Sequence, residues 1–141
     1  MNKTKSNIGS RILAGVIDYG IIYTFFFVII FYFGEPDVEG TYHLNGFSAL
    51  IPIVFWFAMT VGLEVGMGGT IGNSIMGLKV ISIKENNRNV TFNQSLKRHL
   101  LDPIDMFFFG LVGAITIEYT ERNQRVGDLW AKTIVVRLNQ I

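Results

Sequence analysis

The sequence predicts an α-helical integral membrane protein with two full transmembrane helices, a third short or re-entrant hydrophobic helix and a small cytoplasmic β element. Half of the 141 residues are hydrophobic and 16% are charged, whereas soluble domains carry about 25% charged residues. Three apolar runs carry the prediction, at residues 12–33, 47–65 and 103–117. The length fits one domain over residues 1–141, and the lack of cysteine excludes a disulfide framework.

The first two apolar runs are long enough to cross a bilayer. At about 1.5 Å per residue, residues 12–33 form a helix of roughly 33 Å, and the hydrocarbon core is about 30 Å thick. This run is too long for a signal peptide, and no small-residue cleavage pattern follows it. The second run, residues 47–65, is interrupted only by Pro52 near its start and Glu64 near its end.

The distribution of Lys and Arg predicts the orientation. The connection at residues 34–46 contains three acidic residues and no Lys or Arg, whereas residues 67–101 are rich in both. Because basic residues concentrate in cytoplasmic loops, the N-terminus is expected in the cytoplasm and the acidic connection outside. We therefore expect a multi-pass protein of the cell membrane, of the bacterial cytoplasmic type.

The third apolar run, residues 103–117, is only about 22 Å long as a helix. It either crosses a thinned bilayer, or enters and returns with Gly110 and Gly113 as bends, buried by protein. The basic tail at residues 118–141 favours the re-entrant alternative, because that places the tail in the cytoplasm.

Short strands are predicted on this cytoplasmic side. Residues 78–84 and 132–138 alternate and are rich in β-branched side chains, which is typical of strands, and residues 90–92 could add a third. The two longer strands can pair only if both lie on one side of the membrane. Residues 92–101 then form an amphipathic helix at the interface, whose apolar side consists of Phe92, Leu96, Leu100 and Leu101.

Three polar residues in apolar or basic surroundings resemble a family signature. Arg11 opens the first apolar run, Asp18 lies within it, and Asp128 lies in the tail. With the stretch at residues 69–80, they resemble the RDD family, which is named for one arginine and two aspartates. The resemblance covers nearly the whole chain and implies a transport role. A cation/proton antiport activity has been proposed within the family.

Three positions depart from the family pattern. Asn73 stands where the family often has lysine, Gly127 where it often has histidine, and Lys132 where it often has glycine.

Asp18 is the main candidate for function. A carboxylate at the centre of a membrane helix costs about 2.5–3.5 kcal/mol and is usually paired, hydrated or protonated. Asp18 is therefore a proton or cation site, an ion-pair anchor for helix packing, or a ligand contact. Arg11 shares its helical face but lies about 10 Å away along the axis. Glu64 either meets both residues near the cytoplasmic end or simply reaches the interface.

The remaining acidic candidates lie outside the first two runs. Asp102 and Asp105 flank Pro103 in a helix-start pattern, so they are expected at the N-cap and third helical positions; cation binding is the alternative. Asp128 either pairs with Arg11 and clamps the tail onto the first helix, or is a solvated acid on a loop.

Two functional hypotheses follow. The first is a small transporter, a monovalent cation/proton antiporter with Asp18 as the titrating carboxylate. It requires a homo-oligomer, because two or three spans enclose no pathway. A row of small residues suits close helix contact, formed by Ala58, Gly62 and Gly66. The second is a non-transporting module that assembles with or regulates a partner membrane protein.

Other classes find no support in the sequence. The glycine-rich stretch at residues 68–72 lacks the lysine and following hydroxyl of a phosphate-binding loop. His43 and His99 are separated by a span and form no obvious metal pair. We therefore expect the lipid bilayer as the main partner and no nucleic acid, metal, cofactor or enzymatic activity.

Overall fold

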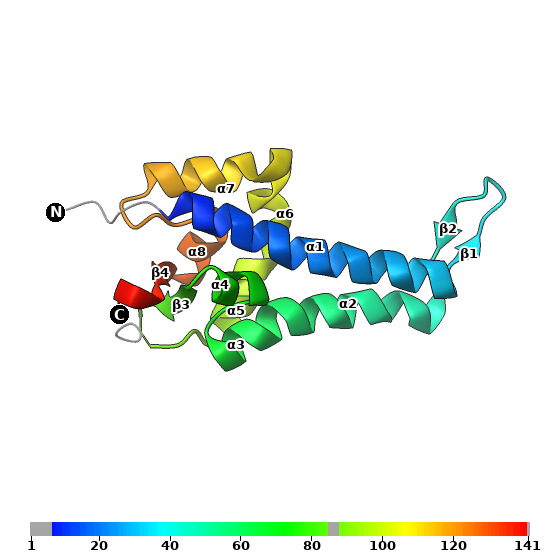
Figure 1. Cartoon of the computed structure of the whole chain (residues 1–141), viewed down its shortest axis with the longest axis horizontal. Helices are drawn as coiled ribbons and strands as arrows, with labels where there is room; N and C mark the ends of the chain where they lie inside the picture. The colour runs from blue at the N-terminus through cyan, green and yellow to red at the C-terminus, as the bar shows by residue number, and fades with distance from the viewer. Residues whose placement is uncertain (1–6, 85–87, 141) are drawn as a thin grey trace.

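Two long helical rods run side by side along the long axis of the molecule (Figure 1). The computed structural model describes residues 7–84 and 88–140. The first rod is α1 (Ile8–Phe33). The second rod spans Gly46–Met67 and consists of η1 (Gly46–Ala49), α2 (Leu50–Phe57), the π-helical turn η2 (Ala58–Gly62) and α3 (Leu63–Met67). A small hairpin joins the rods at their far end, formed by β1 (Glu35–Pro36) and β2 (Tyr42–His43).

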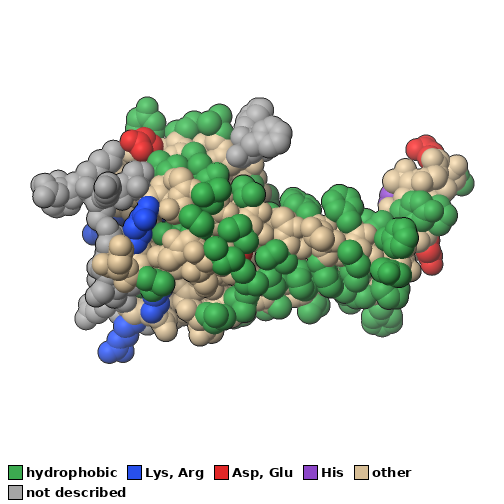
Figure 2. All heavy atoms as spheres, in the orientation of Figure 1, with side chains coloured by type: hydrophobic (Ala, Val, Ile, Leu, Met, Phe, Trp, Pro, Cys, Tyr) green, Lys and Arg blue, Asp and Glu red, His purple; other side chains and the backbone are tan. Residues whose placement is uncertain are grey.

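Both rods are long and apolar enough to cross a membrane, as the sequence predicts. Within the protein, only 22% of the most apolar window of α1 and 11% of that of the second rod is buried. A core helix of a soluble protein would be mostly buried. Figure 2 shows hydrophobic side chains covering the visible face of this part, with Lys and Arg at the end that carries the N-terminus. This distribution fits a lipid environment around the rods.

The π-helical turn lies in the middle of the second rod. Its Thr60 hydroxyl donates to the Trp56 carbonyl at 2.7 Å, and both Thr60 and Val61 are buried. The row of Ala58, Gly62 and Gly66 is exposed on the outside of the monomer. A Cβ added at Gly66 would meet nothing within 4 Å, so this surface is available to a neighbour.

The third apolar run differs in detail from the prediction. It is divided into α6 (Asp102–Asp105) and α7 (Phe107–Tyr119). Gly110 adopts a φ of +84° and bends the chain, whereas Gly113 does not have a positive φ. α7 packs against α1 beside its N-terminal half and leads back to the end where the N-terminus lies (Figure 1).

The predicted pairing of the two longer strands is confirmed. β3 (Leu78–Ser82) and β4 (Thr133–Arg137) are antiparallel, with Val80 opposite Val135. Both residues belong to a small buried core with Ala14, Leu78 and Val90.

The predicted third strand is wrong. In the described residues this segment forms a single bridge, between Ile81 and Asn89. The predicted helix at residues 92–101 is present as α5 (Phe92–Leu100). Thr91 and Gln94 form a capping box at the start of α5, and this helix-start signature outweighs the β propensity of Val90 and Thr91.

α5 buries its polar face. Gln94, Ser95, Arg98 and His99 are buried, whereas Phe92 and Leu100 on the predicted apolar side are exposed. This inverts the pattern of a helix in a soluble protein. Two other short helices complete the layer around α5, α4 (Ile71–Ile75) and α8 (Val126–Ala131), and η3 (Leu138–Gln140) ends the described chain.

Candidate functional site

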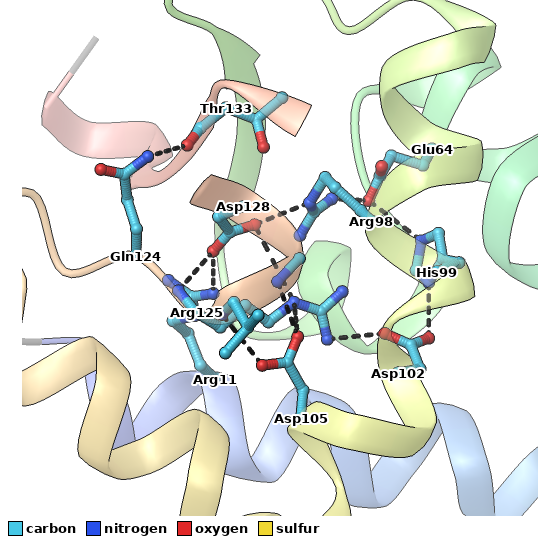
Figure 3. Close-up of polar contacts among 12 residues, drawn as sticks. Arg11, Glu64, Arg98, His99, Asp102, Asp105, Gln124, Arg125, Asp128 and Thr133 are labelled. Carbon is cyan, nitrogen blue, oxygen red and sulfur yellow. Dashed lines mark hydrogen bonds and ion pairs between the residues drawn. The ribbon is translucent and has the colours of Figure 1, made fainter. Parts of the chain in front are cut away.

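A buried network of charged side chains joins α1, α3, α5, α6 and α8 (Figure 3). We call it the ion-pair network. Its acidic members are Glu64, Asp102, Asp105 and Asp128, and its basic members are Arg11, Arg98, His99 and Arg125.

Asp128 lies at the centre of this network and is fully buried. Its carboxylate accepts hydrogen bonds from the guanidinium of Arg11, from Arg98 Nε at 2.7 Å and from the backbone N–H of Arg125 at 3.1 Å. Arg11 also donates to the carbonyl of Asn123 at 2.6 Å. The predicted clamp between Arg11 and Asp128 is therefore confirmed, and a solvated loop position for Asp128 is excluded.

The neighbouring arginines determine the pKa of Asp128. Burial alone raises the pKa of a carboxyl group, but the charges of Arg11, Arg98 and Arg125 outweigh it and hold the pKa of Asp128 well below its usual range. Asp128 is therefore a fixed negative charge at physiological pH.

Glu64 is also fully buried, so the expectation that it reaches the interface is wrong. It pairs with the guanidinium of Arg98 and lies 3.3 Å from Nε2 of His99. Neither partner was predicted from the sequence, because the polar side of residues 92–101 was expected to face water. The available signal was the presence of Arg98 and His99 in this amphipathic helix, since a buried acid needs a cationic partner.

Asp102 connects His99 to α1 and to the tail. It lies 2.7 Å from Nδ1 of His99, accepts a hydrogen bond from the Tyr19 hydroxyl at 2.7 Å and lies 2.8 Å from Nη1 of Arg125. Burial opposes its ionisation, but the charges of Arg125 and His99 lower the pKa of Asp102 to about 2. Burial likewise opposes the charge on His99, yet the neighbouring carboxylates of Asp102 and Glu64 raise its pKa.

The expected helix-capping roles of Asp102 and Asp105 are wrong. Leu101 occupies the N-cap position of α6, and neither acid caps that helix. Asp105 instead accepts hydrogen bonds from the backbone N–H groups of Val126 and Gly127 at 2.9 and 3.0 Å. These N–H groups begin α8, so Asp105 caps a helix remote in sequence, which no local pattern reveals.

Gly127 allows this contact because α8 approaches α5 closely. A Cβ at position 127 would lie 2.7 Å from the carbonyl oxygen of Arg98. At position 132, where the family often has glycine, the structure has a φ of +56°, which lies in the left-handed region that favours glycine.

Asp18 is buried but lies outside the ion-pair network. It accepts hydrogen bonds from the Thr70 hydroxyl at 2.6 Å and the Gly72 backbone N–H at 2.7 Å. The expected meeting of Asp18 with Arg11 and Glu64 is wrong, because the N-terminus of α4 occupies that side of α1. A Cβ at Gly72 would lie 2.1 Å from the carbonyl oxygen of Ala14, so α4 fits there only without a side chain.

A cavity of about 160 Å³ adjoins Asp18. Its charged wall consists of Asp18, Asp102, Asp105, His99 and the three arginines Arg11, Arg98 and Arg125. Thr60, Thr70 and Asn73 are also polar lining residues, and the apolar wall includes Met106, Ala114 and Ile117. At roughly 30 Å³ per molecule, it could hold about five waters, or a small ion with part of its hydration shell.

The charges of the ion-pair network balance in one protonation state. Its four carboxylates face three guanidinium groups, so the network is neutral when His99 carries a proton. Asp18 adds a further negative charge, and among residues 7–84 and 88–140 no basic side chain forms an ion pair with it.

Within the same described ranges, no cluster of three His, Cys, Asp or Glu residues is arranged to hold a metal ion. His43 pairs with Asp37 on the exposed hairpin at 2.8 Å, at the opposite end of the molecule from His99.

The fold and the site define a small helical protein with two helices long and apolar enough to span a membrane, whose tail is fastened to its first helix by an arginine–aspartate pair. The chain belongs to the RDD family, whose model matches residues 5–132. Neither the curated proteins nor the solved structures contain a detectable match.

Proposed function

We propose that the protein is a multi-pass transporter of the cell membrane that exchanges a monovalent cation for a proton at Asp18. The proposed orientation places the N-terminus and both strands β3 and β4 in the cytoplasm and the β1–β2 hairpin outside. α7 then re-enters and returns on the cytoplasmic side. The Lys and Arg side chains in Figure 2 lie at the end away from the hairpin, which supports this orientation. The proposal includes no enzymatic step.

The observation that carries the proposal is the unpaired carboxylate of Asp18 beside a cavity. The four other buried acids of this region face Arg or His side chains, whereas the hydrogen-bond partners of Asp18 among the described residues are a hydroxyl and a backbone amide. Proton and cation would compete for this carboxylate, and such competition couples their movements. Asn73 lines the same cavity and supplies an amide oxygen in place of the family's frequent lysine.

The proposal requires a homo-oligomer. Two rods and the shorter α7 enclose no pathway across a bilayer. The exposed row of Ala58, Gly62 and Gly66 offers a surface for close helix contact.

Proteoliposomes test this proposal through flux at Asp18. Asp18→Asn retains one acceptor for the Gly72 N–H and one donor for the Thr70 hydroxyl, so we expect a folded protein that has lost cation-dependent proton movement. Asn73→Lys should also block flux, because it supplies a tethered ammonium to the cavity. Glu39→Gln, on the exposed hairpin, is the matched control. Flux that persists in Asp18→Asn, or an inactive wild-type protein, would refute the proposal.

The alternative is a module that assembles with or regulates a partner membrane protein without transport. The ion-pair network favours it, because Arg11, Glu64 and Asp128 have the buried, paired geometry of structural contacts. A wild-type protein without flux, together with co-purification of a partner that depends on Gly62, would support this alternative.

A further inference from the structure

A second polar cavity lies where β3, α5 and α8 meet. It has a volume of about 260 Å³, room for about nine waters at roughly 30 Å³ each. Three lysines line it, Lys84, Lys97 and Lys132. Among the described residues, the lining of this lysine cavity includes no acidic side chain.

We propose that the lysine cavity binds the phosphate group of an anionic phospholipid headgroup. Ammonium groups are common phosphate ligands. Thr91 and Asn93 also line the cavity, at the N-cap and second helical positions of α5. The partial positive charge at this helix N-terminus adds to the attraction for an anion.

The lysines come from neighbouring parts of the chain, and one of them lies near an aromatic ring. Nζ of Lys97 lies 5.5 Å from the ring centroid of Trp130, which also lines the cavity. The carbonyl of Lys132 accepts a hydrogen bond from the Ile83 N–H at 3.0 Å, which brings Lys132 beside the residue that precedes Lys84.

Lys132 is the C-cap of α8. Its φ of +56° lies in the left-handed region, which is common at helix C-termini and favours glycine. Glycine would relieve the backbone but would remove one of the three ammonium groups.

The surroundings of the cavity indicate a lipid as the source of the phosphate. Phe92, Leu129 and Trp130 are each about half exposed on the two helices that form the cavity. Apolar and aromatic side chains next to lysines are typical of the headgroup region of a membrane. This proposal assumes that α1 and α2 cross the bilayer, but it does not depend on transport.

Native mass spectrometry of the purified full chain tests this site. The protein would be supplied with equal amounts of phosphatidylglycerol and phosphatidylcholine, and the retained lipid counted. We expect at least a tenfold preference for phosphatidylglycerol. The preference should disappear in the triple variant Lys84→Gln, Lys97→Gln, Lys132→Gly, and persist in Arg88→Gln, an exposed basic control.

Two further measurements keep the test decisive. Lys132→Gly alone should weaken the preference severalfold while leaving the melting temperature equal or higher, which separates lipid binding from folding. Soluble glycerol 3-phosphate should compete only weakly with phosphatidylglycerol for the site. If it binds to the protein in phosphatidylcholine discs as tightly as the lipid does, the lipid assignment is overturned and the phosphate source is a free compound. Equal lipid preference in the triple variant and Arg88→Gln would overturn the site itself.

Discussion

Asp128→Asn is the sharpest test of the ion-pair network as a structural lock. Asp128 is fully buried and contacts the guanidinium groups of Arg11 and Arg98, with Arg125 Nε at 3.9 Å. Asparagine leaves these three cations without their central counter-charge. Breaking a buried ion pair in this way costs about 3–5 kcal/mol. We therefore expect a loss of stability in that range.

A double-mutant cycle with Arg11→Gln assigns part of this loss to one pair. Arg11→Gln alone leaves Asp128 with Arg98 but leaves the Asn123 carbonyl without its guanidinium donor, so we expect a loss of about 1–3 kcal/mol. In the Asp128→Asn background, Arg11 no longer has a carboxylate partner at this position, so Arg11→Gln should cost less stability there than in the wild-type protein. The double variant should therefore lose less stability than the sum of the two single losses. A coupling free energy of about 1–3 kcal/mol is expected for contacting residues.

Thermal unfolding of the purified protein, followed by tryptophan fluorescence, provides the assay. At about 3 °C per kcal/mol for a chain of this size, Asp128→Asn should lower the melting temperature by roughly 10 °C. Glu39→Gln on the exposed hairpin should change it by less than about 2 °C. A melting temperature of Asp128→Asn equal to that of the control, or strictly additive single losses, would refute a lock between α1 and the tail.

Four other predictions follow from particular contacts. Gly72→Ala should destabilise by about 1–3 kcal/mol or more, because the new methyl group would overlap a carbonyl of α1; normal melting would contradict this. Lys132→Gly should stabilise by about 0.5–1 kcal/mol, measured as a higher melting temperature. Because the pKa of His99 is higher in the folded protein than its unfolded value of about 6.5, protonated His99 stabilises the fold fully below pH 6.5, and this stabilisation is lost as the pH rises through the folded pKa. The melting temperature should therefore fall as the pH rises above 6.5, and His99→Gln should lack this dependence. A cysteine at Asp37 should label from outside intact cells and one at Asn139 should not; external labelling at Asn139 would exclude the re-entrant arrangement.

The two rods and the β3–β4 pair follow directly from sequence patterns. Their signals are long apolar runs and alternating β-branched residues, which local physics determines. The same reasoning failed at Val90, where the four-residue capping box from Thr91 to Gln94 outweighed strand propensity. It also failed at Gly113, because a glycine in an apolar helix serves equally for a bend or for close packing. Here it serves close packing: a Cβ added at Gly113 would lie 3.0 Å from the carbonyl oxygen of Asp105.

The candidate site was predictable only in part. The pairing of Arg11 with Asp128 followed from charge and from the family pattern, since both residues are expensive to bury alone. Glu64 and its partner Arg98 are 34 positions apart in the sequence, and Asp105 and its partner Gly127 are 22 positions apart. No local periodicity encodes contacts over such separations. They depend on α5 turning its polar face inward, where Arg98 and His99 meet the buried carboxylates.

The structure divides the buried acids into two groups with different consequences for any mechanism. The ion-pair network is neutral with His99 protonated, so it offers a passing cation little net attraction. Asp18 lies beside the 160 Å³ cavity and has no ion-pair partner among the described residues, so under the proposed exchange it is the carboxylate at which proton and cation would compete. Arg125 connects the network to this cavity, because it lines the cavity and lies near three carboxylates, with Nη1 2.8 Å from Asp102 and Nε 3.6 Å from Asp105 and 3.9 Å from Asp128. Removal of its charge would therefore change the electrostatic field at Asp18 and would also leave these three carboxylates with one cation fewer.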